Sequence, residues 1–304
     1  MSLSYVGEDI NMSRPKGAKN ITPFKERKQI GTVSPKNVLH LVKSNKSPLE
    51  NYHNLLRHEE YYLYWVNDMH DELQKTKSEL AQLKKTEAKK GPKGPKEATF
   101  QKYGWYSKQL ILLEAINGLE VFYKRTFIAL GNLLREYISE EKVKGNIDAK
   151  VLWSLSGDVD VASLIFEPQL FHDYEKINEA TKMLVGKFYY VENASKTKTL
   201  SAIFQIRHTL SHNGGLVTNS DNTKFRMLGF AIQPKEVIDP TAENLSLSIF
   251  RFLKEESQKF TDWLREQTII FLKKRGGVPA TKKGDLQKLL GGENKDWLGT
   301  IKWV

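Results

Sequence analysis

The sequence predicts an all-α fold, a helical bundle of four to five long helices with a small β-hairpin insertion. Two observations carry this prediction: apolar residues recur at spacings of three and four over several long stretches, and segments rich in Gly, Pro and Asn separate those stretches. A chain of 304 residues with 39% hydrophobic residues can bury a sizeable core. The sequence contains no cysteine, which excludes a disulfide framework, a thiolate nucleophile and cysteine-ligated zinc.

The first 98 residues divide into an arm, a helix and a linker. Residues 1–48 show no sustained period and contain four prolines, so we expect a flexible basic arm. Residues 49–98 comprise a long helix and a Lys/Gly/Pro-rich linker that begins at Lys84. Apolar residues at helical spacing indicate this helix: Leu55, Leu56, Leu63, Val66, Met69, Leu73, Leu80 and Leu83. Its aromatic residues are expected in the core: Tyr61, Tyr62, Tyr64 and Trp65.

Residues 99–275 carry the other long helices and form the main helical domain. A continuous apolar stripe predicts the second long helix: Leu112, Ile116, Leu119, Tyr123, Phe127, Leu130, Leu134 and Ile138. One acidic residue, Glu120, lies close to that stripe, and the pair Gly145-Asn146 supplies a stop signal. Apolar periodicity predicts three further helices: 173–187, 198–211 and 242–274.

The β-hairpin is predicted directly after the helix over 198–211. Residues 212–215, His-Asn-Gly-Gly, end that helix, because Asn and Gly tolerate the left-handed conformation of a helix C-cap. Two short segments, 216–217 and 224–232, have strand-like composition and are joined by polar turn residues. Residues 276–304 form a C-terminal tail in this division of the chain.

The formal net charge of +11 is unevenly distributed. Residues 1–50, 84–96 and 271–284 each carry a net charge of +5, which leaves −4 for the rest of the chain. These basic stretches are either solvated linkers or flexible arms that attract phosphate groups, and the charge alone does not decide between them. No apolar run is long enough to span a bilayer, and the first 50 residues lack a signal-peptide core, so we expect a cytoplasmic protein without a membrane partner.

One segment, Ile206 to Gly215, concentrates residues that can perform chemistry. His208 and His212 are four residues apart and share a helix face, while Arg207 lies about 140° around the helix from His212. A guanidinium binds phosphate oxygens, and a nearby imidazole can transfer a proton, so the pair suits phosphodiester chemistry. Three simpler interpretations remain open: a zinc site at the two histidines, satisfaction of backbone carbonyls at the helix end, and a hydrolase pair of Ser211 and His212.

The same segment resembles a known family. Arg207-His208-(three residues)-His212, late in a helix and followed by Asn213-x-Gly215, resembles the Arg-polar-x3-His motif of the HEPN superfamily of all-α ribonucleases and nucleotide-binding domains. The stretch Leu119-Glu120-Val121-Phe122-Tyr123-Lys124 is similar to the acidic position that many members carry on an earlier helix. In topology the resemblance covers about residues 103–274.

The resemblance implies a metal-independent endoribonuclease that needs no cofactor and leaves a 2′,3′-cyclic phosphate. Arg207 would neutralise the scissile phosphate, and His212 would act on the ribose 2′-OH. His208 would support the site, and Glu120 would orient Arg207 or His212. Ser211 and Asn213 are, with Arg207, the expected substrate-binding residues.

The resemblance also implies partners: RNA as substrate, a second copy paired through the Arg207–His212 helix, and an antitoxin or sensor protein in a toxin–antitoxin or antiphage setting. The alternative is a catalytically silent HEPN-like module that dimerises and binds nucleotide or RNA in a larger assembly, since a fold does not guarantee an activity. A third hypothesis is a helical DNA-binding protein whose lysine arms hold duplex DNA.

Overall fold

The computed structural model describes residues 43, 45–84, 97–139, 141, 143, 160–240, 244–275, 278–291 and 295–304. The all-α prediction is confirmed in this part of the chain, where every regular element is a helix. The α-helices are, in order, α1 (Pro48–Lys84), α2 (Glu97–Leu134), α4 (Val161–Phe166), α5 (Tyr174–Val185), α6 (Ser195–Asn213), α7 (Asn219–Met227), α8 (Leu245–Lys273) and α9 (Lys283–Leu290). Three 3₁₀ turns accompany them: Arg135–Tyr137, Ala280–Lys282 and Lys295–Thr300.

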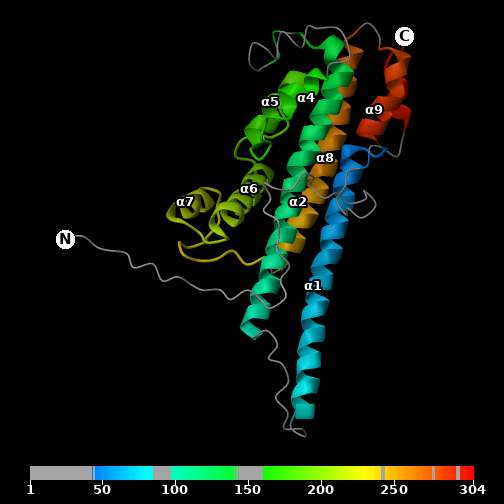
Figure 1. The fold of residues 1–304 in the computed structure, drawn as a ribbon. Coiled ribbons are helices and arrows are strands. Elements are labelled where there is room, and N and C mark those ends of the chain that lie inside the picture. The colour runs from blue at the N-terminus through cyan, green and yellow to red at the C-terminus, as the bar shows by residue number, and fades with distance from the viewer. Residues whose placement is uncertain are drawn as a thin grey trace, which may run out of the picture. The chain divides into compact units, whose positions relative to one another are not determined.

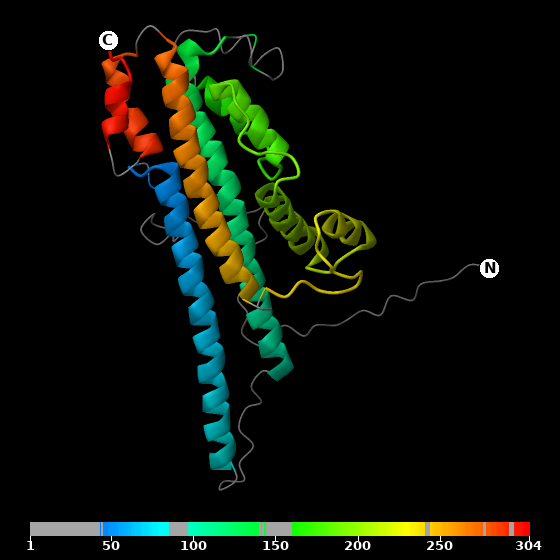
Figure 2. The same ribbon diagram turned by 180° about the vertical axis from the view of Figure 1, so that it is seen from behind.

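Helix α2 is the centre of the unit formed by residues 42–304. It packs against α1 and α8 and also against α4, α5, α6 and α9. Helix α1 runs antiparallel to α2, and α8 runs parallel to it (Figures 1 and 2). The predicted apolar stripe from Leu112 to Ile138 is confirmed, since all eight of its residues are buried. A helix with so many neighbours needs apolar residues on most of its surface, and α2 has them.

Helix α1 is attached to α2 and α8 by one stripe of its surface. A capping box starts the helix, because Ser47 and Glu50 satisfy each other's backbone N–H groups. The close approach of α1 to α2 depends on Gly118, where a Cβ atom would lie 3.0 Å from the Tyr52 ring. The prediction that Tyr61, Tyr62, Tyr64 and Trp65 belong to the core is wrong: each is more than a third exposed. Among the described residues of α1, the buried apolar side chains are Tyr52, Leu56, Leu63 and Val66 instead.

The predicted β-hairpin is also wrong. Residues 219–227 form α7, and among the described residues only an isolated bridge between Leu216 and Val237 pairs extended backbone in this region. The reason is a second capping box: the Thr218 hydroxyl accepts the Asp221 N–H at 3.1 Å, and the Asp221 carboxylate accepts the Thr218 N–H at 3.0 Å. Polar residues that resemble a hairpin turn are therefore the cap and first turn of a helix.

The remaining helix predictions agree with the structure to within a few residues at the described ends. Helix α6 ends where expected, with Gly214 in the left-handed conformation at φ 59°. Three parts of the sequence prediction lie outside the described residues: the linker after Lys84, the stop signal at Gly145-Asn146 and almost all of the N-terminal arm. Helices α1 and α9 both pack directly on α2. The division of the chain into an N-terminal helix, a domain of residues 99–275 and a C-terminal tail stays a prediction.

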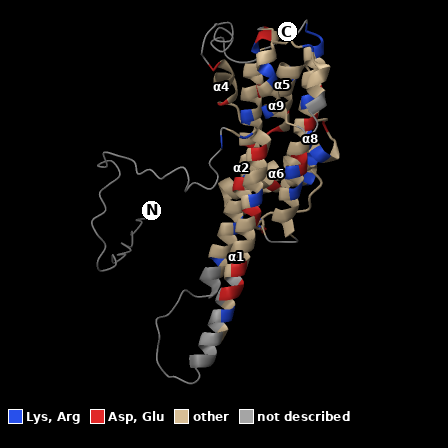
Figure 3. Ribbon diagram, turned by 90° about the vertical axis from the view of Figure 1, so that its right-hand side faces the viewer, with Lys and Arg blue, Asp and Glu red and all other residues tan. Residues whose placement is uncertain are grey.

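Charges of both signs occur along α1, α2 and α8 (Figure 3). None of the helices that the structure describes combines the length and the apolar character needed to cross a membrane.

Candidate functional site

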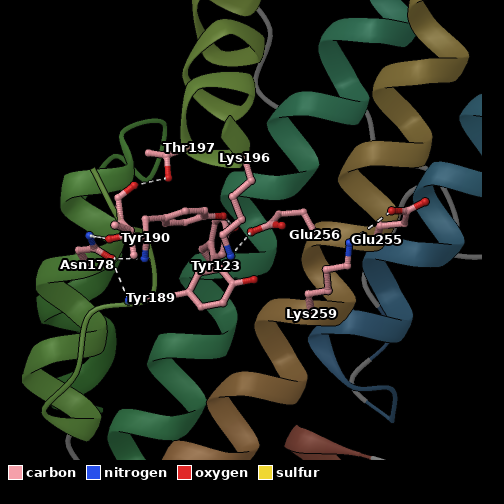
Figure 4. Close-up of polar contacts among 10 residues, drawn as sticks. Tyr123, Asn178, Tyr189, Tyr190, Lys196, Thr197, Glu255, Glu256 and Lys259 are labelled. Atoms are coloured by element: carbon pink, nitrogen blue, oxygen red, sulfur yellow. Dashed lines mark hydrogen bonds and ion pairs between the residues drawn. The ribbon is translucent and has the colours of Figure 1, made fainter. Parts of the chain in front are cut away.

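Helix α6 carries the motif residues, and its first turn is anchored in a polar cluster of four buried residues, Tyr123, Tyr189, Tyr190 and Glu256, and the partly exposed Lys196 (Figure 4). Lys196 Nζ lies 3.6 Å from Glu256 Oε1 on α8 and 3.6 Å from the centre of the Tyr189 ring. The hydroxyl groups of Tyr190 and Tyr123, which lies on α2, are hydrogen-bonded at 2.6 Å. Lys196 therefore attaches the first turn of α6 to α8, and the tyrosine pair attaches the segment just before α6 to α2.

The C-terminal end of α6 is fixed by a separate set of contacts to α2. Gln109 Nε2 on α2 donates a hydrogen bond to the Leu210 carbonyl oxygen at 3.0 Å, inside the core. A Cβ atom at Gly215 would lie 3.4 Å from the Trp105 ring, so the chain leaves α6 in close contact with the first turns of α2. With both ends attached, α6 holds its side chains in a defined position relative to α2.

Arg207 lies in the contact between α6 and α2. Its Nε donates a hydrogen bond to Asn117 Oδ1 at 2.8 Å, and its Nη2 lies 3.9 Å from Glu120 Oε2. The Arg207 side chain is 24% exposed, so it is neither fully buried in the helix contact nor free in solvent. Asn117 and Glu120 are three residues apart and share one face of α2, which explains why both reach the same arginine.

The Glu120 carboxylate has three cationic or potentially cationic neighbours. Besides Arg207, Lys124 Nζ lies 3.8 Å from Oε1, one helical turn along α2. His172 Nδ1, in the segment between α4 and α5, lies 3.8 Å from Oε2 and is shielded from solvent. Glu120 is thus the point at which side chains from α2, α6 and the α4–α5 segment meet.

His208 and His212 lie on the exposed face of α6, with ring centres 4.7 Å apart. The pKa of His208 is below its usual value, because partial burial disfavours the charged ring and the nearby charges of His212 and Lys224 repel a proton. The carboxylate of Asp221 acts in the opposite direction. The lowered pKa favours the neutral form of the His208 ring.

Ser211 and Asn213, the other two predicted substrate-binding residues, differ in their surroundings. Ser211 is exposed. Asn213 Nδ2 donates a hydrogen bond to Asp221 Oδ2 at 2.9 Å, so this amide is already used to join α6 to α7. Asp221 also accepts a hydrogen bond from Gln205 Nε2 at 2.8 Å. Burial raises the pKa of Asp221, but the hydrogen bonds from Thr218 and Asn213 lower it by a larger amount. The net result is a pKa below the usual value of an aspartate.

The six predicted site residues therefore form two groups rather than one. Arg207 and Glu120 lie together at the α2–α6 contact, whereas His208, Ser211, His212 and Asn213 lie on the exposed side and end of α6. The hydrogen bond and the ion pair of Arg207 are made to Asn117 and Glu120, not to His212. His172, which does share a carboxylate with Arg207, was not predicted, because it is a lone histidine in a segment without helical periodicity.

Chemically, the first group offers a positioned guanidinium and the second offers imidazole rings open to solvent. Among the residues described, no three His, Asp or Glu side chains converge as they would around a metal ion. Comparisons of this chain with protein families, with characterised proteins and with solved structures found no match.

Proposed function

We propose that this protein is a metal-independent endoribonuclease of the HEPN type. The observation that carries the proposal is the placement of Arg207: an arginine in the second half of α6, held by Asn117 and Glu120, keeps 24% of its side chain exposed to solvent. A pre-oriented guanidinium binds phosphate oxygens without first having to be ordered. One turn further along α6, His212 is exposed and able to reach a nucleic-acid backbone.

The proposed reaction is an internal transfer within RNA. A base removes the proton of the ribose 2′-OH, and the 2′ oxygen attacks the adjacent phosphorus. The bond from phosphorus to the 5′ oxygen breaks, and an acid protonates the leaving oxygen. The products are a 2′,3′-cyclic phosphate and a 5′-hydroxyl. Arg207 neutralises the charge that develops on the phosphate, and His212 carries the proton.

Pairing of two copies through α6 is part of this proposal. Within one chain Arg207 faces α2, whereas His212 lies on the exposed side of the same helix. In the proposed dimer, pairing of α6 with itself would place two Arg207/His212 pairs in one cleft, and a self-complementary contact of this kind is what a C2 dimer requires. We further propose that an antitoxin or sensor protein controls this activity in a cytoplasmic defence system.

One observation favours the silent RNA-binding module as a second candidate. The guanidinium of Arg207 is hydrogen-bonded to Asn117 and lies near Glu120, and such contacts also occur where an arginine only joins two helices. In that case Arg207 still contributes to phosphate binding, but no group transfers a proton.

The experiment compares four proteins on single-stranded RNA in a buffer that contains EDTA. Wild type should produce 2′,3′-cyclic phosphate ends, and Arg207→Ala and His212→Ala should each lower the rate by about 100-fold or more. Arg251→Ala, which removes an exposed arginine on α8, is the matched control and should cleave as wild type does.

A fifth protein, the His172→Ala variant, tests the contact with Glu120. Because His172 acts on Arg207 only through the carboxylate, its loss should slow cleavage by about tenfold or less. Equal cleavage by wild type, Arg207→Ala and His212→Ala would contradict the ribonuclease proposal. Tight RNA binding that depends on Arg207, without any product, would establish the silent module instead. DNA of the same sequence should not be cleaved, because it lacks the 2′-OH.

A further inference from the structure

Large apolar side chains gather on one exposed surface of the α1–α2 pair, and nothing in the proposed reaction uses them. We call this surface the aromatic face. Its members are each more than a third exposed: Tyr61, Tyr62, Trp65 and Met69 on α1, and Tyr103, Tyr106 and Leu110 on α2. The rings of Tyr62 and Trp65 are themselves in contact, with centres 5.7 Å apart.

Helix geometry brings the members on α1 and α2 to the same level and the same side. The Tyr52 hydroxyl on α1 donates a hydrogen bond to the Ala115 carbonyl oxygen on α2 at 3.0 Å, which fixes the antiparallel register. Equal steps along both helices from this contact place Trp65 level with the turn that contains Tyr103. Helix α8 packs against both α1 and α2. With about 100° between successive residues, the aromatic face lies on the side of the α1–α2 pair opposite to α8.

The aromatic face is larger than the apolar patches that monomeric proteins usually expose. Its side chains together expose roughly 700 Å², taking about 200 Å² for one whole large apolar side chain. The largest patch on a typical monomer covers about 300 to 600 Å². Two such faces in contact would bury up to about 1,400 Å², and stable protein interfaces bury about 1,200 to 2,000 Å². The area therefore fits a contact between two copies of this chain.

The spacing of exposed residues on α1 is that of a helix–helix contact. Alternating steps of four and three residues connect one stripe, which we call the open stripe: His58, Tyr62, Trp65, Met69 and Glu72. A second stripe with the same spacing is buried: Tyr52, Leu56, Glu59, Leu63 and Val66. This heptad spacing is typical of a helix surface that packs along a partner helix. Helix α1 thus has the pattern for two helix contacts, and the residues that the structure describes bury only one of the two stripes.

Charges near the two ends of the open stripe favour an antiparallel partner of the same sequence. Arg57 is exposed beside the first end, and Asp68 and Glu72 are exposed at the other. Glu60 lies on the far side of the helix from the open stripe. When two copies of α1 pair antiparallel, the arginine of each copy faces the acidic end of the other. Parallel pairing would bring the two acidic ends together, and like charges repel.

We propose that two copies of this chain pair through their α1 helices, antiparallel and centred on Trp65. In this arrangement Trp65 packs against the partner's Trp65, and Tyr62 packs against the partner's Met69, a favourable sulfur–aromatic contact. Arg57 reaches the partner's Glu72. The contact is related by a two-fold axis, so it closes after two copies.

This contact is separate from the α6 pairing of the proposed function. Helix α6 contacts α2 through Gln109 and Asn117, on the side of α2 that faces away from α1 (Figures 1 and 2). Both contacts can therefore form in one assembly. The α1 contact does not depend on RNA cleavage.

Disulfide cross-linking tests the arrangement, because the sequence contains no cysteine that could interfere. A mixture of Tyr62→Cys and Met69→Cys proteins should form an intermolecular disulfide on mild oxidation, since antiparallel pairing brings these two positions within disulfide reach. Each variant alone should cross-link far less, because its own two cysteines lie about 10 Å apart along the helices. Phe188→Cys, at an exposed position outside the aromatic face, mixed with Met69→Cys is the control and should not cross-link.

Sedimentation equilibrium tests the energetics of the same contact. Trp65→Glu should weaken self-association by about tenfold or more, because it places a charge at the centre of the interface. The matched control, Phe188→Glu, changes an equally exposed aromatic residue outside the face and should stay within about twofold of wild type. Arg57→Glu and Glu72→Arg should each weaken association by about fivefold, and the double variant should return to within about twofold of wild type. Far-UV circular dichroism confirms that each variant is folded.

The outcomes separate the parts of the proposal. A cross-link yield in the mixture no higher than in the control, or equal self-association of wild type and Trp65→Glu, would overturn the pairing. Failure of the double charge reversal to restore association would overturn the antiparallel arrangement. A monomeric wild type whose Trp65→Glu variant loses affinity for RNA would assign the aromatic face to RNA instead. None of the association readouts requires RNA cleavage, so the proposed function and this contact can fail separately.

Discussion

The substitution Glu59→Gln should make the protein more stable at alkaline pH. Glu59, on α1, is only 2% exposed. Burial raises its pKa from 4.5 to about 7, and the charge of Glu114 on α2 adds to this shift. Glutamine has nearly the same shape and cannot ionise, so the substitution removes the buried charge with little change in packing.

The sign and size of the effect follow from the two pKa values. Between pH 4.5 and about 7 the folded protein retains a proton that the unfolded chain has released, so the free energy of unfolding falls as pH rises through this window. The full shift corresponds to about 3 kcal/mol; part of it falls below pH 5, so we expect about 2 kcal/mol between about pH 5 and about pH 8. Above the window the wild type bears this cost and the Gln variant does not.

Urea unfolding, followed by circular dichroism at about pH 5 and about pH 8, measures the effect directly. The stability of Glu59→Gln relative to wild type should increase by about 2 kcal/mol between these pH values. Glu266→Gln, at an exposed position on α8, is the control and should show no such change. If the difference between Glu59→Gln and wild type is the same at both pH values, the Glu59 carboxyl does not titrate with a raised pKa in the folded protein.

Three further substitutions test the helix cap, the buried polar cluster and the arginine support. Thr218→Ala removes a cap of α7 and should lower the free energy of unfolding by about 1 kcal/mol; no change would argue against the capping box. Tyr123→Phe leaves the buried Tyr190 hydroxyl without its partner and should cost about 1 to 2 kcal/mol, measured by urea unfolding; a neutral result would mean that the hydroxyl finds another partner. Asn117→Ala frees Arg207 Nε and should lower kcat for RNA by about tenfold with little change in stability; an unaffected kcat would show that Asn117 does not position the arginine.

The helical core could be predicted from the sequence because its signal is periodic. The apolar residues from Leu112 to Ile138 recur at helical spacing over about seven turns. This pattern is typical of a helix face that packs in a core, and all of these residues are buried. The exposed aromatic residues of α1 could not be placed in the same way. Their composition suggests a core, but whether a neighbouring helix covers them depends on tertiary packing.

The β-hairpin predicted directly after α6 was wrong because the local sequence fits two structures. Residues 218–223 are polar and resemble a turn, yet a Thr-x-x-Asp pattern also starts a helix, and the reciprocal hydrogen bonds of Thr218 and Asp221 stabilise that outcome. The candidate site likewise has a part that the sequence predicts and a part that it does not. Spacing identified the shared face of His208 and His212, whereas the meeting of Glu120 with His172 joins residues that no short pattern relates.

The most direct test of the central claim is end-group analysis of RNA after incubation with purified protein in the presence of EDTA. We expect 2′,3′-cyclic phosphate ends with wild type and Arg251→Ala, and a loss of about 100-fold or more with Arg207→Ala and His212→Ala, while helical content is unchanged. RNA that stays intact with wild type, or cyclic ends that form equally with Arg207→Ala and His212→Ala, would contradict the claim that this helix end cleaves RNA.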